Sequence, residues 1–272
     1  MDNPNGIYYS NLKGEDVFHK FNLKKGKFLG RGSAGKVYLV QPMNGLGRTL
    51  AAKKFSLVHS NRERKFSLFA KEAELMQTFH HPHLVPRIMA ACCDKYALIV
   101  MPYYPQGDLV LDGKQDPSRV HCLMSQVALA VEYLHQNNVA HNDIKLDNVF
   151  VDASDRAYLG DMGLALKVKD ETRTAPAWRV GGTKDYWAPE IREAGEEDNI
   201  DPFKCDVFAI GIMYWALVTG QDFQAGTKFL VRLQVASVNL SAVQRVSLQF
   251  MLEPDPAKRP AASVVVKIMN MK

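Results

Sequence analysis

A glycine-rich segment near the N-terminus is the first feature whose residue types suit chemistry. Gly30, Gly32 and Gly35 follow the pattern G-x-G-x-x-G, with Ser33 between the last two glycines. Glycines let a backbone turn tightly and approach phosphate oxygens without interference from Cβ. Strand-like residues 36–40 follow, not the helix that a dinucleotide-binding loop requires. The segment predicts a strand-turn-strand flap over a nucleotide, and an ordinary glycine-rich hairpin is the alternative.

A lysine and a glutamate in apolar surroundings form the second feature. Lys53 lies in a strand-like run of small and apolar residues, and Glu72 follows within a helix-like segment. If both side chains point inward they must pair, because an unpaired buried charge is strongly unfavourable. We expect an ion pair between them. Lys54 and Glu74 are rivals for the same roles, and a surface lysine with a solvated glutamate is the alternative.

Polar residues cluster in the segment 141–148, which reads HNDIKLDN, and Asp161 begins a D-x-G triplet 18 residues after Asp143. These motifs resemble the catalytic loop and metal-binding triplet of the eukaryotic-type protein kinase family, here with a non-arginine H-x-D loop. The resemblance extends from about residue 24 to 262. It also includes the glycine-rich loop, Lys53, Glu72, the segment after Met101, the triplet at 188–190, and residues 206–211 and 255–260.

The resemblance implies phosphoryl transfer from ATP with Mg²⁺, or alternatively Mn²⁺, to protein substrates. Lys53 would hold the α- and β-phosphates and be oriented by Glu72. Asp143 would accept or orient the proton of the substrate hydroxyl, and Lys145 would neutralise the γ-phosphate. The implied metal ligands are Asn148 and Asp161.

Further site residues are implied in the same way. Lys145, with a threonine ahead of the 188–190 triplet, favours Ser/Thr over Tyr as the acceptor, although tyrosine or dual specificity stays open. The substrate platform would comprise Thr183, Ala188, Pro189 and Glu190, with Glu190 paired to Arg259. The ATP-binding residues would be Gly30, Gly32, Ser33, Gly35, Val37, Ala51, Lys53, Met101, Pro102, Tyr104, Asp108 and Phe150. Simple core is the alternative for the apolar members, and solvated surface for Asp108.

Two residues depart from the family pattern. Asn142 stands where most members have the arginine that binds a phosphorylated activation loop. We therefore hypothesise activity without activation-loop phosphorylation, although Thr172 and Thr174 lie in that loop. Met162 replaces the usual phenylalanine, an exchange of apolar residues that should not abolish catalysis.

The elements that must position these residues change character at about residue 102. Strand-like runs occupy residues 24–55, and a capping-box pattern at Ser60 then starts a helix that His81 and Pro82 stop. Residues 97–101 read as a buried strand, and a second amphipathic helix follows Asp116. The expected fold class is α+β, and the expected fold is bilobal and similar to that of protein kinases. Residues 24–102 would form a small antiparallel-sheet lobe with one long helix, and residues 103–272 a larger, mainly helical lobe. Residues 1–23 form an N-terminal extension, either a regulatory or docking strand or a frayed end.

Composition limits the other functions of this 272-residue chain. A net charge of +5 without a dense basic stripe argues against nucleic acid. The longest apolar run, residues 207–218, is too short to span a membrane and reads as a core helix. Four cysteines without a pairing pattern predict reduced thiols and a cytoplasmic location, with the nucleus or delivery into a host cell left open.

A regulatory partner protein is a further expectation. A pseudokinase scaffold is the alternative function, and a small-molecule phosphotransferase a third.

Overall fold

The computed structural model describes residues 6–9, 17–32, 35–45, 47–58, 61–168, 172–221 and 239–271. The chain forms two compact units: unit 1 comprises Met1–His80 and Val85–Pro105, and unit 2 comprises His81–Leu84 and Gln106–Lys272. The division after residue 105 lies three residues beyond the expected one. Residues 81–84 belong to unit 2 because His83 Nδ1 lies 3.0 Å from the carbonyl oxygen of Ala157 and Leu84 bridges to Leu159.

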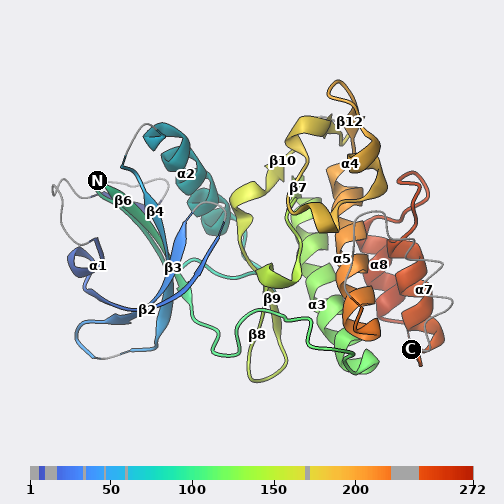
Figure 1. Ribbon diagram of the computed structural model, residues 1–272, viewed down its shortest axis with the longest axis horizontal. Coiled ribbons are helices and arrows are strands. Elements are labelled where there is room, and N and C mark those ends of the chain that lie inside the picture. The colour runs from blue at the N-terminus through green and yellow to red at the C-terminus, as the bar shows by residue number, and fades with distance from the viewer. Residues whose placement is uncertain are drawn as a thin grey trace. The chain divides into compact units, whose positions relative to one another are not determined.

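Unit 1 contains a six-stranded sheet with the order β1-β5-β6-β4-β3-β2. Figure 1 labels its strands β2, β3, β4 and β6. β1 and β5 are parallel, and every other neighbouring pair is antiparallel. The predicted meander of three strands and the later buried strand are confirmed. The bounds are Ile7–Tyr9 (β1), Leu23–Arg31 (β2), Lys36–Pro42 (β3), Leu50–Ser56 (β4), Met89–Cys92 (β5) and Tyr96–Pro102 (β6).

Helix α2, Arg62–Thr78, packs on one face of this sheet against β4 and β6. The ring of its Phe69 meets that of Phe55 in an edge contact with 5.4 Å between centroids. The long helix was predicted, but its capping box is wrong in detail: Asn61 is the N-cap and makes no side-chain capping bond, while Ser60 lies outside the described residues. Tertiary packing of the apolar face, more than the cap, must therefore stabilise this helix.

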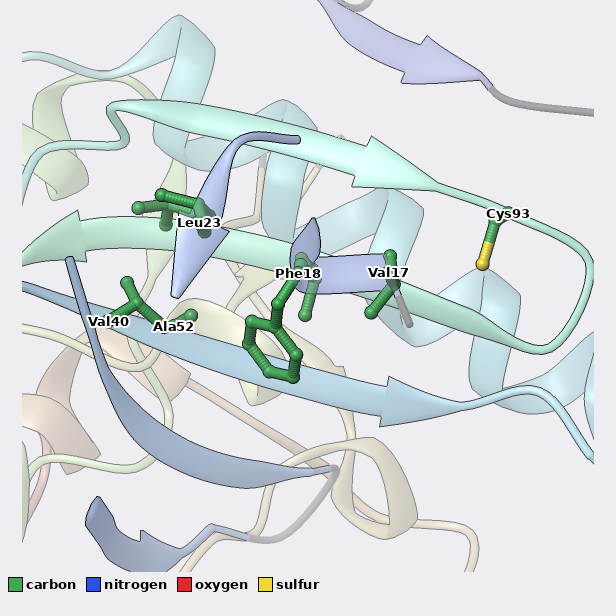
Figure 2. Packing of buried hydrophobic residues seen from close by; sticks show 8 residues of the cluster. Val17, Phe18, Leu23, Val40, Ala52 and Cys93 are labelled. Carbon is green, nitrogen blue, oxygen red and sulfur yellow. The ribbon is translucent and has the colours of Figure 1, made fainter. Parts of the chain in front are cut away.

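The N-terminal extension is part of unit 1 wherever the structure describes it. Strand β1 extends the sheet, and helix α1, Val17–Lys20, covers the sheet face opposite α2. The side chains of Val17 and Phe18 are buried against Val40 and Ala52 (Figure 2). This corrects the alternative of a frayed end, because the apolar side chains of α1 complete a core that the sheet alone would expose.

Unit 2 is mainly helical, as expected. Its helices are α3 (Pro117–Gln136), α4 (Pro189–Glu193), α5 (Pro202–Thr219), α7 (Ala242–Met251) and α8 (Ala262–Met269). Its strands are β7 (Val139–Ala140), β8 (Val149–Val151), β9 (Ala157–Leu159), β10 (Leu166–Lys167), β11 (Ala175–Pro176) and β12 (Asn199–Ile200). They form three two-stranded pairs, β7-β10, β8-β9 and β11-β12, which border the polar loops.

Two helices of unit 2 follow directly from the sequence. The predicted second helix is α3, where the Asp116 carboxylate accepts the Arg119 amide at 2.7 Å and Pro117 occupies the first turn. Helix α5 contains the apolar run 207–218. It is the one helix in the described ranges with the length and hydropathy of a membrane span, and 89% of it is buried in the protein. A helix that is apolar all round is typical of a core, so α5 is weak support for a membrane span.

Candidate functional site

In unit 1, Lys53 and Glu72 form the predicted ion pair. The ammonium Nζ lies 2.8 Å and 2.9 Å from the two carboxylate oxygens, and the residues are 3% and 1% exposed. Strand parity explains the choice: Lys53 of β4 lies on the same sheet face as Phe55, toward α2. Lys54 points to the other face, where its Nζ lies 3.5 Å from the ring centroid of Tyr96, and Glu74 is exposed. The rival pair is therefore excluded.

The glycine-rich segment is a hairpin between β2 and β3, closed by a bond from the Gly32 amide to the Gly35 carbonyl at 2.9 Å. Ser33 lies outside the described residues. At Gly35 a Cβ would lie 2.6 Å from the carbonyl oxygen of Lys54, so glycine is required here by the close approach of β4. This reason holds for both interpretations of the segment, the nucleotide flap and the ordinary hairpin.

The other predicted ATP-binding residues of unit 1 lie on the neighbouring strands. Val37 pairs with Lys53 in register, and Ala51 pairs with Met101. Met101 and Pro102 end β6 and are half-buried, as is Tyr104 beyond them. Strand pairing thus places Ala51 beside Met101, another predicted ATP-binding residue.

In unit 2, the Asp143 carboxylate is at the centre of a polar cluster in the loop after β7. Its Oδ2 accepts from Asn148 Nδ2 at 3.1 Å and lies 3.4 Å from Lys145 Nζ. Its Oδ1 accepts from both the amide and the hydroxyl of Thr183 at 2.9 Å. Asn148 Nδ2 also bonds to the Asp143 carbonyl. Four predicted site residues from two segments therefore meet at one carboxylate.

Thr183 connects this loop to the predicted substrate platform. Its hydroxyl donates to Asp143 and accepts from Lys145 Nζ at 3.0 Å. The preceding Gly182 has φ +92°, and a Cβ there would overlap the carbonyl oxygen of Asn142. Only glycine fits this position, which lets the platform approach the loop.

Asp161 stands next to the cluster with an unusual backbone conformation. It has φ 56° and ψ 74°, and its side chain accepts the Gly163 amide at 3.2 Å. The Gly160 amide bonds to the Asn148 carbonyl at 2.8 Å, so the two predicted metal ligands come from hydrogen-bonded segments. Met162 is buried, as an apolar replacement for phenylalanine should be.

The donors fit Mg²⁺ or Mn²⁺ and do not fit a soft metal such as zinc. The described residues contain no group of three or more His, Cys, Asp or Glu side chains that could hold a metal ion. A carboxylate and an amide oxygen suit a hard cation that keeps several waters and binds substrate phosphates. The Asn148 amide nitrogen faces Asp143, so its Oδ1 is the oxygen that remains for such a cation.

Asp206 anchors the loop 141–148 from inside α5. Its carboxylate accepts the amides of His141 at 2.7 Å and Asn142 at 2.8 Å, and His135 Nε2 lies 2.9 Å from it. Asp206, the first residue of the matched segment 206–211, lies one turn inside α5. No sequence signal pointed to His135, whose partner is 71 positions away.

Asn142 is the second residue whose role only the structure reveals. Its Nδ2 donates to the carbonyls of Leu164, at 3.3 Å, and Arg179, at 3.2 Å, while its Oδ1 accepts the Gly181 amide at 3.1 Å. Its φ of +66° is a conformation that asparagine tolerates better than most residues. One amide side chain thus joins both ends of the segment 164–181.

Asp108 and Phe150 lie together in unit 2, where an isolated bridge pairs their backbones. Burial raises the pKa of the Asp108 carboxyl, and the nearby Asp147 carboxylate raises it further. Asp108 is nevertheless an exposed residue, as the alternative of a solvated surface position expects. Its role in ATP binding stays a prediction.

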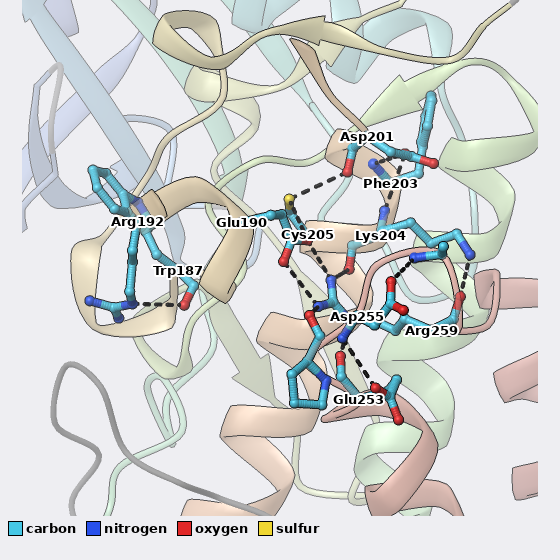
Figure 3. A network of polar contacts seen from close by, with 12 residues as sticks. Trp187, Glu190, Arg192, Asp201, Phe203, Lys204, Cys205, Glu253, Asp255 and Arg259 are labelled. Atoms are coloured by element: carbon cyan, nitrogen blue, oxygen red, sulfur yellow. Dashed lines mark hydrogen bonds and ion pairs between the residues drawn. The ribbon is translucent and has the colours of Figure 1, made fainter. Parts of the chain in front are cut away.

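The predicted ion pair of Glu190 and Arg259 is confirmed (Figure 3). Two guanidinium nitrogens bond to the two carboxylate oxygens at 2.6 Å and 3.0 Å, and Arg259 is fully buried. The remaining guanidinium hydrogens bond to backbone carbonyls of Glu253, Lys204 and Pro254. Ala188 is the N-cap of α4, and Pro189 and Glu190 are its first two residues, so this pair fixes the predicted platform to the C-terminal part of unit 2.

Comparison with known proteins identifies similar sequences. The family described as the protein kinase domain matches residues 23–270. The proline-rich receptor-like protein kinase PERK2 of Arabidopsis thaliana is 30% identical over 226 residues, which cover 79% of this chain and 30% of that protein. The cell cycle serine/threonine-protein kinase CDC5/MSD2 of Saccharomyces cerevisiae is 24% identical over 255 residues, or 89% of this chain and 35% of that protein. The chain spans about a third of the length of these curated relatives.

Proposed function

The chain belongs to the protein kinase domain family, and we propose that it transfers the γ-phosphate of ATP to Ser or Thr hydroxyls of protein substrates. The observation that carries the proposal is the environment of Asp143, whose carboxylate is held by Asn148, Lys145 and Thr183. A scaffold has no chemical need for a carboxylate, an amide and an ammonium group converging on one point.

Asp143 is the proposed acceptor of the substrate hydroxyl proton. Its Oδ1 already accepts a hydrogen bond from one hydroxyl group, that of Thr183, at 2.9 Å. A substrate hydroxyl requires the same geometry. Lys145 Nζ, 3.4 Å from the other carboxylate oxygen, is proposed to stabilise the charge that develops on the transferred phosphoryl group.

Mg²⁺ and ATP are the proposed cofactor and phosphate donor. Asn148 and Asp161 would hold the cation, which neutralises phosphate charge when bound. Lys53, fixed by Glu72, would hold the α- and β-phosphates, and the hairpin 30–35 would cover them. The names of the relatives, which include a serine/threonine-protein kinase, support hydroxyl acceptors of the Ser/Thr type.

Activity without phosphorylation of the activation loop is a finer part of the proposal. The Asn142 amide bonds to the backbone at Leu164, Arg179 and Gly181. Strand β11 lies within the segment 164–181 and pairs with β12. In the same segment, the Arg173 guanidinium lies 4.1 Å from the ring centroid of Phe203. These contacts support a segment that is held in place without a phosphate group.

The test is transfer of labelled γ-phosphate from ATP-Mg²⁺ to a generic protein by unphosphorylated protein, with phosphoamino-acid analysis. Asp143→Asn and Lys53→Met should lose at least about 100-fold in rate, because positioning and charge stabilisation supply most of the catalysis. Lys54→Met is the matched control for Lys53→Met, since Lys54 faces the opposite side of β4, and it should stay active.

Two outcomes would change the assignment. ATP binding without transfer would favour the pseudokinase scaffold. Transfer that requires prior phosphorylation and is lost in Thr172→Ala and Thr174→Ala would contradict the finer proposal while leaving the kinase assignment intact.

The four cysteines are all free thiols, which supports a reducing, cytoplasmic location as part of the same proposal.

A further inference from the structure

Arg87, which precedes β5 in unit 1, bonds to helix α2 at two points. Its Nη1 donates to the Ala73 carbonyl at 3.0 Å, and its Nη2 donates to Gln77 Oε1. A carbonyl oxygen has two lone pairs, so Ala73 can accept this bond in addition to the helical one. The guanidinium fork therefore holds two successive turns of α2 on the side of β5.

The N-terminal strand β1 holds Arg87 in turn. Ile7 pairs with Ala90 of β5 and is 1% exposed, so β1 is a buried part of the sheet at this point. The preceding Gly6 has φ +55°, and a Cβ there would lie 2.6 Å from Arg87 Nη2. The guanidinium thus lies directly against the backbone of Gly6, where a side chain would displace it.

This arrangement lies beside the proposed catalytic ion pair. Ala73 directly follows Glu72, whose carboxylate binds Lys53 Nζ at 2.8 Å. The N-terminal half of α2 is fixed to the sheet by the contact of Phe69 with Phe55. Arg87 supplies a second, polar attachment in the C-terminal half, and a helix fixed at both points can neither tilt nor rotate away from Lys53.

We propose that Arg87 is a positioning residue that, with β1, holds α2 where Glu72 pairs with Lys53. The N-terminal segment is then a positioning element for the reaction, whose removal or displacement would loosen the ion pair. The kinetic part of this inference rests on the proposed function, whereas the structural part does not.

The experiment compares Arg87→Ala, Arg87→Lys and Gly6→Ala with wild type in the full chain. The control is Arg62→Ala, which removes an exposed ion pair with Asp94 from the first turn of the same helix. Hydrogen exchange of the backbone amides of residues 73–78 measures the fixation of α2. Steady-state kinetics measure its consequence, with kcat separated from KM for the protein substrate.

We expect faster exchange at residues 73–78 and a kcat lower by about tenfold in Arg87→Ala, with KM unchanged. Arg87→Lys should fall between Ala and wild type, because lysine keeps the charge but not the two-pronged geometry. Gly6→Ala, which keeps Arg87 itself, should shift both measurements in the same direction. Arg62→Ala should match wild type.

Exchange and kcat in Arg87→Ala and Gly6→Ala equal to those of Arg62→Ala would overturn the inference. If Arg87→Ala fails to fold, the Gly6→Ala protein decides the outcome alone. A wild-type protein that transfers no phosphate would refute the proposed function, and the exchange measurement would still support or overturn the role of Arg87.

Discussion

At the scale of single residues, Asn142 shows how a small substitution in a known motif changes what the site needs. An arginine at this position would have donors only and could not accept the Gly181 amide. The asparagine amide has both donors and an acceptor, and it satisfies the backbone carbonyls of Leu164 and Arg179 and the amide of Gly181. The Asn142 side chain therefore stabilises the unphosphorylated segment 164–181 and offers no positive charge to a phosphate group.

Asn142→Asp tests this interpretation most sharply. Aspartate also tolerates positive φ and keeps the acceptor for Gly181, but it turns an oxygen toward two carbonyl oxygens. Leaving those carbonyls unsatisfied should cost about 1–3 kcal/mol, and the rate of phosphate transfer should fall by about tenfold or more. Limited proteolysis within residues 164–181 should become faster. Unchanged proteolysis and activity would show that the amide bonds do not hold the segment.

At the scale of elements, the close approach of the chain after residue 181 to the loop 141–148 depends on Gly182. Its φ is +92°, and a methyl group attached to its Cα would overlap the Asn142 carbonyl oxygen, so a side chain has no room here. The loop and the segment can therefore share the Asp143 carboxylate only with glycine at this position.

Gly182→Ala should lower kcat by about tenfold or more, since backbone strain of this kind costs about 1–3 kcal/mol. Thermal unfolding should change little, because the segment can move away from the loop and relieve the clash. Gly181→Ala is the matched control: no atom lies within 4 Å of its Cβ position and its φ is ordinary. Equal kinetics for the two variants would contradict this account.

Strand β5 provides a prediction about pH. Burial, with a smaller contribution from the neighbouring Cys93, raises the pKa of the Cys92 thiol to about 11. The folded state thus favours the neutral thiol, and its contribution to stability is present below the unfolded pKa, about 8.5, and is lost as the pH rises toward 11. In the folded protein at pH 8, iodoacetamide should label the exposed Cys122 and spare Cys92. Mass spectrometry of the peptides checks this, and comparable labelling of both thiols would show that Cys92 is accessible and ionised.

At the scale of the whole molecule, the buried pair of Glu190 and Arg259 ties together parts of unit 2 that are distant in sequence. The partners are 69 positions apart, and Arg259 also bonds to the carbonyl of Lys204 in α5. A guanidinium that is fully buried requires every one of these acceptors, because an uncompensated charge in the interior is strongly unfavourable.

Glu190→Gln should lower the free energy of unfolding by about 3 kcal/mol, because it leaves the buried guanidinium without a countercharge. Urea denaturation followed by tryptophan fluorescence measures this, since Trp215 is buried in the adjacent α5. Glu193→Gln, on the exposed side of the same helix, is the control and should be neutral within about 0.5 kcal/mol. Equal midpoints for both variants would mean that the ion pair does not stabilise the unit.

The sequence by itself determined the elements and the chemical groups. Periodicity and end signals located α3 between Asp116 and Asn137, the strand that contains Lys53 and its neighbours, and the core helix α5. These features depend on neighbours within a few residues, so local patterns contain them. The motifs also named the residues around Asp143, because their types and spacing match those of the protein kinase family.

Only the tertiary structure decided which of these groups meet. The sequence left Lys53 and Lys54 as rivals, and the choice came from the sheet face that α2 covers. It could not connect His135 to Asp206, Asn142 to Arg179, or the N-terminal strand to Arg87, because each contact joins distant positions and depends on how packed elements bring their surfaces together. Hydrogen-bond partners of buried polar groups are settled by that packing, which no local pattern records.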